Sequence, residues 1–413
     1  MQLKFVLLVA FLGLATANRK EYNGYSLFEI TPKDQPEWHL VMQFLDKPGF
    51  DFFAAPKEFN KPITVLVAPE VMVGFKSVLT LQKIEYKVII QNYEDVVRAE
   101  DEELAKKPRD LKADASFTSF MTYNEIIAYL NSLASNYPNI VSVKSIGTTY
   151  GGRAIPLIKI SSGGSNKPAI LVDAGIHARE WIAPPVALYI INQLVENPDN
   201  AALFANVDWY IIPILNPDGY SYTHTSERLW RKNRKPGSYC YGTDLNRNFD
   251  FHWMENGASS NECSETFAGT KGFSELESQA LRDFVLANAD SIKLYLTFHS
   301  YGQYLLYPWG YTSALPDNEA TLRSLATKVN AAIKAVAGTS YTIGTSTNVL
   351  YAAAGGSDDW VKGVGGVELA YTIELPAGGS YGFNPPASRI LPIVQETWQG
   401  ILVYQKYVEE NFA

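Results

Sequence analysis

The sequence predicts two folded units: a small α+β unit with a ferredoxin-like order of elements, and a larger α/β unit built on a largely parallel sheet. Three observations predict this fold class. The chain has 413 residues, 46% hydrophobic and 19% charged, which is enough to bury a large core. Its first part contains segments in the order strand, helix, strand, strand, helix, strand. Beyond a strongly charged stretch, the apolar runs become continuous, as in strands buried on both faces.

The first segment is expected to be a secretion signal rather than part of the fold. Lys4 precedes an apolar run at residues 5–14, and a small-x-small cleavage site follows at residues 15–17. A membrane anchor is the alternative, but a spanning helix needs about 20 apolar residues and the run is about half as long. We therefore expect a signal peptide at residues 1–17 and a secreted, extracellular protein.

Residues 18–93 carry the predicted elements of the small unit. Strands are expected where apolar residues alternate or run together, and helices where apolar residues recur every three to four positions. The expected strands are residues 25–31, 50–53, 62–67 and 86–90, and the expected helices are residues 35–45 and 71–81. This order is the split βαβ arrangement of ferredoxin-like domains.

A charged stretch at residues 94–112 joins the two units. Its pattern is helical until Pro108, and it carries four basic residues near its end, Lys106, Lys107, Arg109 and Lys112. Such a charge run is most often a solvated helix face. At a domain boundary, exposed basic residues are also where a trypsin-like protease cuts, so we expect a connecting helix and an activation segment here, with the exact cleavage site open.

Residues 113–413 form the larger predicted unit. Its first helix is expected at residues 122–133, because Thr122 and Glu125 form a capping box. Continuous apolar runs predict buried strands at residues 169–172, 209–215, 294–298 and 370–373, and helical segments lie between them at residues 185–195, 274–287 and 319–337. This alternation predicts a sheet with helices on both faces, and in such sheets the chemistry gathers where strands end.

Charge and cysteine content exclude several classes of protein. The net charge of −8 argues against a protein that binds nucleic acid through bulk positive charge. No later apolar run is comparable to the first, so no membrane association is expected. Two cysteines exclude a multi-disulfide scaffold and a zinc site of four thiolates. In a secreted protein, Cys240 and Cys263 could form a disulfide, and two free thiols are the alternative.

Two of the five histidines follow buried strands. His177 comes after residues 169–172, with Glu180 three positions on, and His299 comes directly after residues 294–298. One such histidine is usually structural, and His-x-x-Glu alone is a weak signal. Two histidines at equivalent strand ends with one carboxylate form a His₂Glu set, which in catalytic zinc sites leaves the fourth position to water. The fold would have to bring His299 to the other two residues.

One motif points to different chemistry. Residues 378–382 match the G-x-S-x-G pattern of serine hydrolases, around Ser380. That class needs a histidine after the serine in chain order, and no histidine follows His299. We interpret the segment as a glycine-rich loop.

Five motifs occur in order along the larger unit: residues 177–181 (HAREW), 229–234 (LWRKNR), 244–248 (DLNRN), 298–301 (FHSY) and 372–375 (TIEL). Together they resemble the zinc metallocarboxypeptidases of the pancreatic carboxypeptidase A/B type. Each motif is modestly specific, and five in the right order from about Phe117 onward are strongly so. The resemblance implies a secreted zymogen whose catalytic domain has a mixed, mainly parallel eight-stranded sheet flanked by helices, behind a ferredoxin-like prodomain.

The resemblance also implies a role for each matching residue near the metal. His177, Glu180 and His299 would bind one zinc ion. Glu374 would be the general base that activates water, and Arg231 would polarise the scissile carbonyl. This set suits peptide hydrolysis, because zinc lowers the pKa of its bound water to ~7 and a neighbouring carboxylate can carry the proton. A non-catalytic relative would be expected to lack one of these groups.

Further residues are assigned to substrate binding by the same resemblance. Asn246 and Arg247 would hold the terminal carboxylate of the peptide, since Arg offers planar, bidentate recognition. Tyr351 would cover the bound end of the peptide, and Arg179 would be an accessory cation on the non-primed side. Cys240 and Cys263 match the family's disulfide. The partners implied are peptide and protein C-termini, an activating trypsin-like protease and proteinaceous carboxypeptidase inhibitors, with the enzyme itself monomeric.

Specificity depends on Asp358. Within the family, the position seven residues after Tyr351 lies at the base of the side-chain pocket, and aspartate there accompanies release of C-terminal Lys and Arg. Alternatively, Asp358 faces away and pairs with backbone amides, leaving a broader or carboxypeptidase A-like preference for aromatic and aliphatic residues. Two features depart from the family pattern: Ser346, near the same pocket, is not a residue type that the family has there, and the loop at residues 361–366 is one residue longer.

Overall fold

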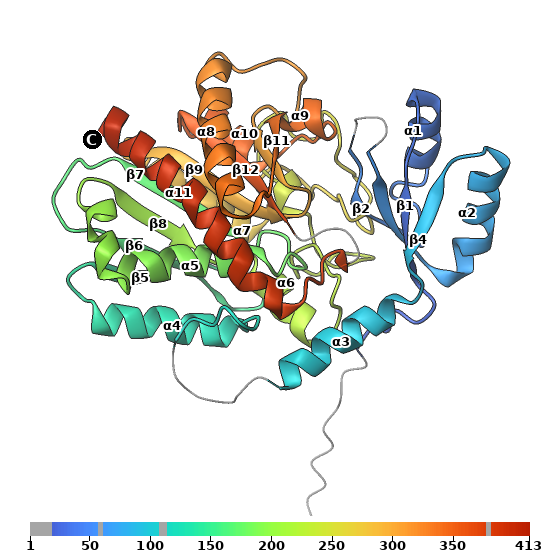
Figure 1. Cartoon of the computed structure of the whole chain (residues 1–413), viewed down its shortest axis with the longest axis horizontal. Coiled ribbons are helices and arrows are strands. Elements are labelled where there is room, and N and C mark those ends of the chain that lie inside the picture. The colour runs from blue at the N-terminus through green and yellow to red at the C-terminus, as the bar shows by residue number, and fades with distance from the viewer. Residues whose placement is uncertain (1–18, 57–60, 107–113, 377–380) are drawn as a thin grey trace, which may run out of the picture.

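The computed structural model describes residues 19–56, 61–106, 114–376 and 381–413. The predicted signal peptide lies outside these residues, as do Lys107, Arg109 and Lys112 of the expected activation segment and Ser380 of the glycine-rich motif. The described chain forms two sheets, one of four and one of eight strands. Figure 1 shows the smaller sheet, in blue, beside the larger unit.

The small unit has the predicted ferredoxin-like order. Its elements are β1 (Ser26–Ile30), α1 (Gln35–Met42), β2 (Phe50–Ala54), β3 (Ile63–Val67), α2 (Pro69–Leu81) and β4 (Tyr86–Ile90). The strands lie in the order β2-β3-β1-β4, and every pair is antiparallel. Phe28 of β1 packs edge-on against Phe75 of α2, with ring centroids 5.6 Å apart, in a core of its own.

Helix α3 (Tyr93–Ala105) leads from β4 along the larger unit (Figure 1). It is tied there by a buried ion pair, in which Glu100 accepts hydrogen bonds of 2.5 and 3.1 Å from the Arg228 guanidinium. The connecting stretch is therefore helical as predicted, and its charged face is only partly solvated.

The larger sheet confirms the predicted fold class. Its strands are β5 (Val141–Thr148), β6 (Ala154–Ile160), β7 (Ala169–Ala174), β8 (Asp208–Ile212), β9 (Ile292–Ser300), β10 (Tyr304–Tyr307), β11 (Thr342–Thr345) and β12 (Leu369–Leu375). They lie in the order β11-β10-β12-β9-β7-β8-β6-β5. The four central strands run parallel, whereas β10 against β12 and both pairings of β6 are antiparallel.

Helices cover both faces of this sheet. The helices of the larger unit are α4 (Tyr123–Asn136), α5 (Ala183–Val195), α6 (Pro217–Thr225), α7 (Leu276–Ala287), α8 (Glu319–Ala337), α9 (Ser346–Val349), α10 (Ser357–Gly363) and α11 (Ile390–Phe412). Residues of α4, α5, α8 and α11 share one apolar core, and residues of α7 and α10 share another. The predicted capping box is present, with Glu125 accepting from the Thr122 backbone N–H at 2.6 Å.

Several elements differ from the expectations. The strand predicted to run to residue 215 ends at Ile212, because Pro213 has no N–H to continue the ladder. Strands β5, β6, β10 and β11 and the 23-residue helix α11 were not expected. Strand β5 is an edge strand in which four of the eight residues are exposed, so it lacks the apolar run that marked the central strands. No helix in the described ranges is both long and apolar enough to cross a bilayer.

Candidate active site

Three neighbouring parallel strands carry the candidate residues to one edge of the sheet. His177 follows β7, His299 lies near the end of β9, and Glu374 lies near the end of β12. Strand β9 pairs with both of the others, and His299 and Glu374 are register partners across the β9–β12 ladder. Because parallel strands end at the same edge, residues about 200 positions apart become neighbours.

His177, Glu180 and His299 converge into one cluster. Their ligand atoms lie within 4.8 Å of one another, and the side chains are almost wholly buried, at 4%, 3% and 1% exposure. Glu180 reaches His177 Nδ1 at 2.8 Å with one oxygen and His299 Nδ1 at 3.2 Å with the other. Two imidazole nitrogens and a carboxylate around one point are the donor set of catalytic zinc sites, so these residues fit a zinc ion.

Asp244 orients this cluster from outside. Its Oδ1 lies 3.1 Å from His177 Nε2, and its Oδ2 accepts from Arg231 Nε at 3.1 Å and Nη2 at 2.9 Å. Burial alone would raise the pKa of Asp244, but Arg231 and His177 hold it well below 3.8. Asp244 therefore stays ionised, fixing the His177 ring and the Arg231 guanidinium together. The sequence placed Asp244 in a motif without indicating this role.

Glu374 lies beside the cluster with an unused oxygen. Its Oε2 is shut off from water and accepts no hydrogen bond among the described residues. Burial raises the pKa of Glu374 to about 7, with His299 opposing the shift and Glu180 adding to it. A carboxyl group with this environment can exchange a proton near neutral pH.

A cavity of about 100 Å³ connects these groups to most of the predicted substrate-binding residues. Its lining includes the three cluster residues and Glu374, together with Arg231, Asn246, Arg247, Tyr351 and Asp358. Asn246 Oδ1 accepts from the Ser357 N–H at 2.9 Å, and Arg247 Nε donates to the Gly257 carbonyl at 2.8 Å. These backbone bonds fix both side chains at the cavity wall.

The two adjacent aspartates of α10 point in different directions. Asp358 is 5% exposed, lines the cavity and accepts from Thr372 Oγ1 at 3.1 Å. Asp359 instead accepts from the backbone N–H groups of Gly310 and Tyr311 at 2.9 and 3.0 Å. Asp358 therefore does not face away from the cavity, as the alternative expected, although the backbone N–H groups of Asp358 and Asp359 also interact with its carboxylate. Ser346 also lines the cavity.

Arg179 is the one predicted site residue that does not line this cavity. It lies in a second cavity of about 700 Å³ between the two units, and Arg231 and Tyr351 line both spaces. Arg179 Nη1 donates to Asp51 of β2 at 2.6 Å, and its guanidinium stacks 4.3 Å from the Phe383 ring centroid. The sequence offered no signal for the Asp51 contact, because that aspartate belongs to no motif.

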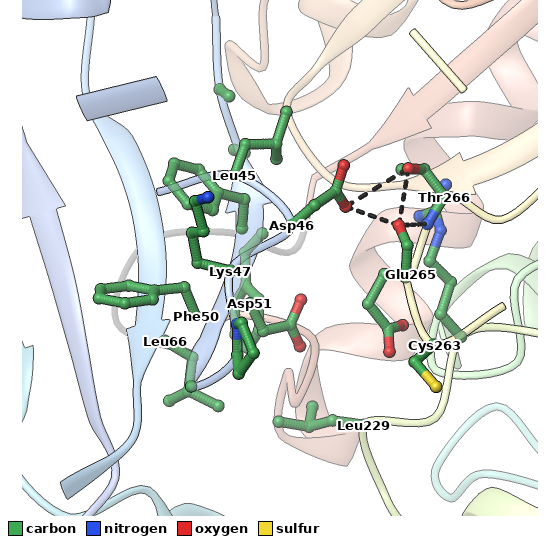
Figure 2. Close-up of a pocket in the computed structure, with 18 of the residues that line it drawn as sticks. Leu45, Asp46, Lys47, Phe50, Asp51, Leu66, Leu229, Cys263, Glu265 and Thr266 are labelled. Atoms are coloured by element: carbon green, nitrogen blue, oxygen red, sulfur yellow. Dashed lines mark hydrogen bonds between the residues drawn. The ribbon is translucent and has the colours of Figure 1, made fainter. Parts of the chain in front are cut away.

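Residues of the small unit close over the site. Phe53, Ala54 and Ala55 of the small unit line both cavities, and Tyr351 packs against the core of the small unit. Figure 2 shows Asp46 of the small unit pointing toward Thr266 of the larger unit. Its Oδ1 accepts a hydrogen bond from Ser264 Oγ at 2.7 Å.

The wall of the second cavity carries several carboxylates, among them Asp51 and Glu265, and one cysteine of a disulfide. Figure 2 shows Asp51 and Glu265 extending their carboxylates into the cavity from facing walls. Glu265 Oε2 has no hydrogen-bond partner in the described chain, and burial, reinforced by Asp51, raises its pKa. The expected disulfide between Cys240 and Cys263 is present at the rim and closes a separation of 23 residues.

Comparisons with known proteins agree with this arrangement. A family model described as zinc carboxypeptidase matches residues 126–400, and one described as carboxypeptidase activation peptide matches residues 28–100. Carboxypeptidase B of Astacus astacus is 51% identical over 72% of this chain and 99% of its own length.

Two solved structures are similar along most of their chains. The crystal structure of carboxypeptidase A from Helicoverpa armigera has a TM-score of 0.90 and 33% identity, covering 95% of this chain and 99% of that one. Bovine thrombin-activatable fibrinolysis inhibitor, in complex with tick carboxypeptidase inhibitor, has a TM-score of 0.69 and 36% identity over 72% of this chain and all of that one. The relatives thus include both A-type and B-type enzymes.

Proposed function

This chain belongs to the zinc carboxypeptidase family and is a metallocarboxypeptidase zymogen, and we propose that its activated form releases C-terminal Lys and Arg from peptides and proteins. One observation carries this specificity: the Asp358 carboxylate lines the cavity next to the candidate zinc site. A buried carboxylate attracts a cationic side chain and imposes a desolvation cost on an apolar one.

His177, Glu180 and His299 would hold the zinc ion, which when bound supplies Lewis acidity and a water of lowered pKa. Glu374 Oε2 has no hydrogen-bond partner in the part of the chain that the structure describes, so it can take a proton from the attacking water and return it to the leaving nitrogen. Arg231 is held by Asp244 and would donate to the scissile carbonyl oxygen as negative charge develops there. Losing one such donor typically costs ~3 kcal/mol of transition-state stabilisation.

Binding of the peptide end would use the fixed side chains of the cavity wall. Asn246 and Arg247 would recognise the terminal carboxylate, which restricts the enzyme to the last residue of a chain. Tyr351 would close over that residue. Arg179, freed from Asp51 after activation, would bind the substrate upstream of the scissile bond.

The small unit would act as an inhibitory prodomain until it is cleaved. We assign residues 1–17 to a signal peptide, 18–93 to the prodomain, 94–112 to the connecting helix and activation segment, and 113–413 to the catalytic domain. A trypsin-like protease would cut among the basic residues near position 109. Secretion as a monomer and inhibition by small proteinaceous inhibitors are further parts of this proposal, the last supported by the inhibitor complex of the bovine relative.

Blocked dipeptides ending in Arg, Phe and Glu test the proposal directly. Full-length protein is treated with trypsin, and kcat/KM is measured for each peptide before and after cleavage. We expect activity to appear on cleavage and Arg to exceed Phe by about 100-fold, the equivalent of roughly 3 kcal/mol from one buried charge pair. Equal or faster release of Phe would overturn the basic specificity, and equal activity before cleavage would overturn the inhibitory role of the small unit.

A further inference from the structure

A buried carboxylate behind the candidate metal site has no part in the function described so far. Asp173 lies in β7 with no exposed surface and accepts hydrogen bonds from two hydroxyl groups of β9. One is the Tyr295 phenol, and the other is Thr297 Oγ1 at 2.7 Å. Asp173 and Thr297 are register partners in the parallel β7–β9 ladder, so the sheet itself sets this contact.

Proton counting determines what Thr297 offers to its other neighbour. A threonine hydroxyl has one proton, and here that proton points to Asp173 Oδ1. The Thr297 oxygen can then only accept on its other side, where His299 Nε2 lies 3.2 Å away. In the neutral ring that a metal ligand requires, His299 therefore carries its proton on Nε2 and keeps the lone pair on Nδ1.

The nitrogen that this tautomer leaves unprotonated, His299 Nδ1, is the one that faces the cluster. His299 Nδ1 lies 3.1 Å from His177 Nδ1 and 3.2 Å from Glu180. His177 reaches the same state by a different route, because its Nε2 meets the Asp244 carboxylate directly. The two rings thus have matched tautomers, one set by a carboxylate and one by a hydroxyl that a carboxylate orients.

We infer that Thr297, oriented by Asp173, is a positioning residue that fixes the tautomer of His299 for zinc binding. This inference rests on the proposed role of His299 as a zinc ligand. Hydrogen-bond partners of metal-binding histidines typically change metal affinity 10–100-fold when they are removed. Asp173 alone could instead serve only to hold β7 against β9, and the experiment must separate these two roles.

The second hydroxyl group that donates to Asp173, the Tyr295 phenol, provides the control. Tyr295 donates to the same carboxylate from the same strand, but its oxygen lies 3.0 Å from Ser357 Oγ, next to Asp358, and not beside a histidine. Removing the Tyr295 hydroxyl therefore costs Asp173 one donor, as removing the Thr297 hydroxyl does. The Tyr295 phenol also lies within hydrogen-bonding reach of Thr297, but of the two hydroxyl groups only that of Thr297 contacts His299 directly.

The test measures zinc affinity of the full-length zymogen by competition with a chelator, together with the thermal stability of the zinc-free protein. We expect Thr297→Val to weaken zinc binding 10–100-fold, Thr297→Ser to restore wild-type affinity, and Tyr295→Phe to leave it unchanged. Unchanged affinity in Thr297→Val, or equal loss in Tyr295→Phe, would overturn the inference. His299→Ala tests the proposed zinc site separately from the role of Thr297. If His299→Ala still binds zinc, the proposed site is refuted. If His299→Ala loses zinc and Thr297→Val keeps it, only the positioning role of Thr297 is refuted.

Discussion

The two cavities of the molecule contrast in how their charged groups are held. Around the smaller cavity, His177, Glu180, Arg231 and Asp244 satisfy one another within a single folded unit. Around the larger cavity, Asp51 and Arg179 meet across two units, and one buried oxygen each of Asp51 and Glu265 has no hydrogen-bond partner among the described residues.

The proposed catalytic centre and the small unit that covers it are therefore held in place by different kinds of contact. The mutually paired charges of the smaller cavity hold one geometry, because moving any member would leave another uncompensated. Glu374 lies beside them in the same unit and keeps one buried oxygen without a partner among the described residues. Between two units, by contrast, buried oxygens that lack partners make the interface easier to open. We therefore interpret the smaller cavity as preassembled and the larger one as a junction that opens when the small unit is released.

The sharpest change inside the centre is Glu374→Gln. The amide cannot accept the proton, so kcat of the activated enzyme should fall about 10³-fold or more, within the upper range for general base catalysis. Zinc content should be unchanged, as checked by elemental analysis. Glu277→Gln is the matched control, because Glu277 is also buried, has an unpartnered oxygen and has its pKa raised to about 7 by burial, yet does not line the cavity. Retained turnover in Glu374→Gln would remove it from the mechanism.

Asp358→Ile should change which C-terminal side chain the enzyme prefers, while the residues proposed for peptide hydrolysis stay in place. The change removes the buried negative charge, so the ratio of kcat/KM for Arg over Phe should fall by about 100-fold or reverse. Measuring both peptides on one preparation provides the internal control, since a folding defect lowers both rates together. An unchanged ratio would show that Asp358 does not read the substrate side chain.

At the junction, Asp51→Asn should raise the activity of the uncleaved zymogen. A charge-assisted hydrogen bond contributes about 1.5–3 kcal/mol, so weakening it should open the junction and increase basal activity about tenfold. Activity after trypsin treatment should match wild type, because Asp51 is then removed with the small unit. Basal activity that stays at the wild-type level would mean that Asp51 does not help to hold the cover.

Asp46→Asn should have the smallest effect. Asp46 is solvent-exposed and accepts from neutral hydroxyls at the rim of the larger cavity, where such contacts contribute about 1 kcal/mol or less. Basal activity of the uncleaved zymogen should therefore rise by less than about fivefold. A rise as large as that of Asp51→Asn would place the closing contacts at the rim rather than at Arg179.

Local patterns predicted the fold where the chain is regularly buried. The continuous apolar runs identified β7, β8, β9 and β12, and the capping box at Thr122 identified the start of α4. Short or half-exposed strands such as β5 and β10 were not predicted, because their side chains do not produce an apolar run of sufficient length.

Prediction of the site depended on how far each contact extends along the chain. His177 and Glu180 share one turn, so their spacing is visible in the sequence, whereas His299 could be paired with them only through its position at a strand end. The roles proposed for Asp244, Thr297 and Asp173 could not be predicted from the sequence. They depend on the β7–β9 register, on the direction of the hydrogen bond from the Thr297 hydroxyl to Asp173, and on the long-range contact between Asp244 and His177. Asp51 was missed because contacts between units leave no periodic signal.

Zinc content before activation tests the central contrast most directly. Uncleaved zymogen and trypsin-activated enzyme are dialysed against the same buffered zinc series, and bound metal is measured by elemental analysis. A preassembled centre predicts one zinc per chain with equal affinity in both forms. If the uncleaved zymogen binds no zinc and the cleaved enzyme does, the centre is not preassembled, because it then depends on removal of the small unit.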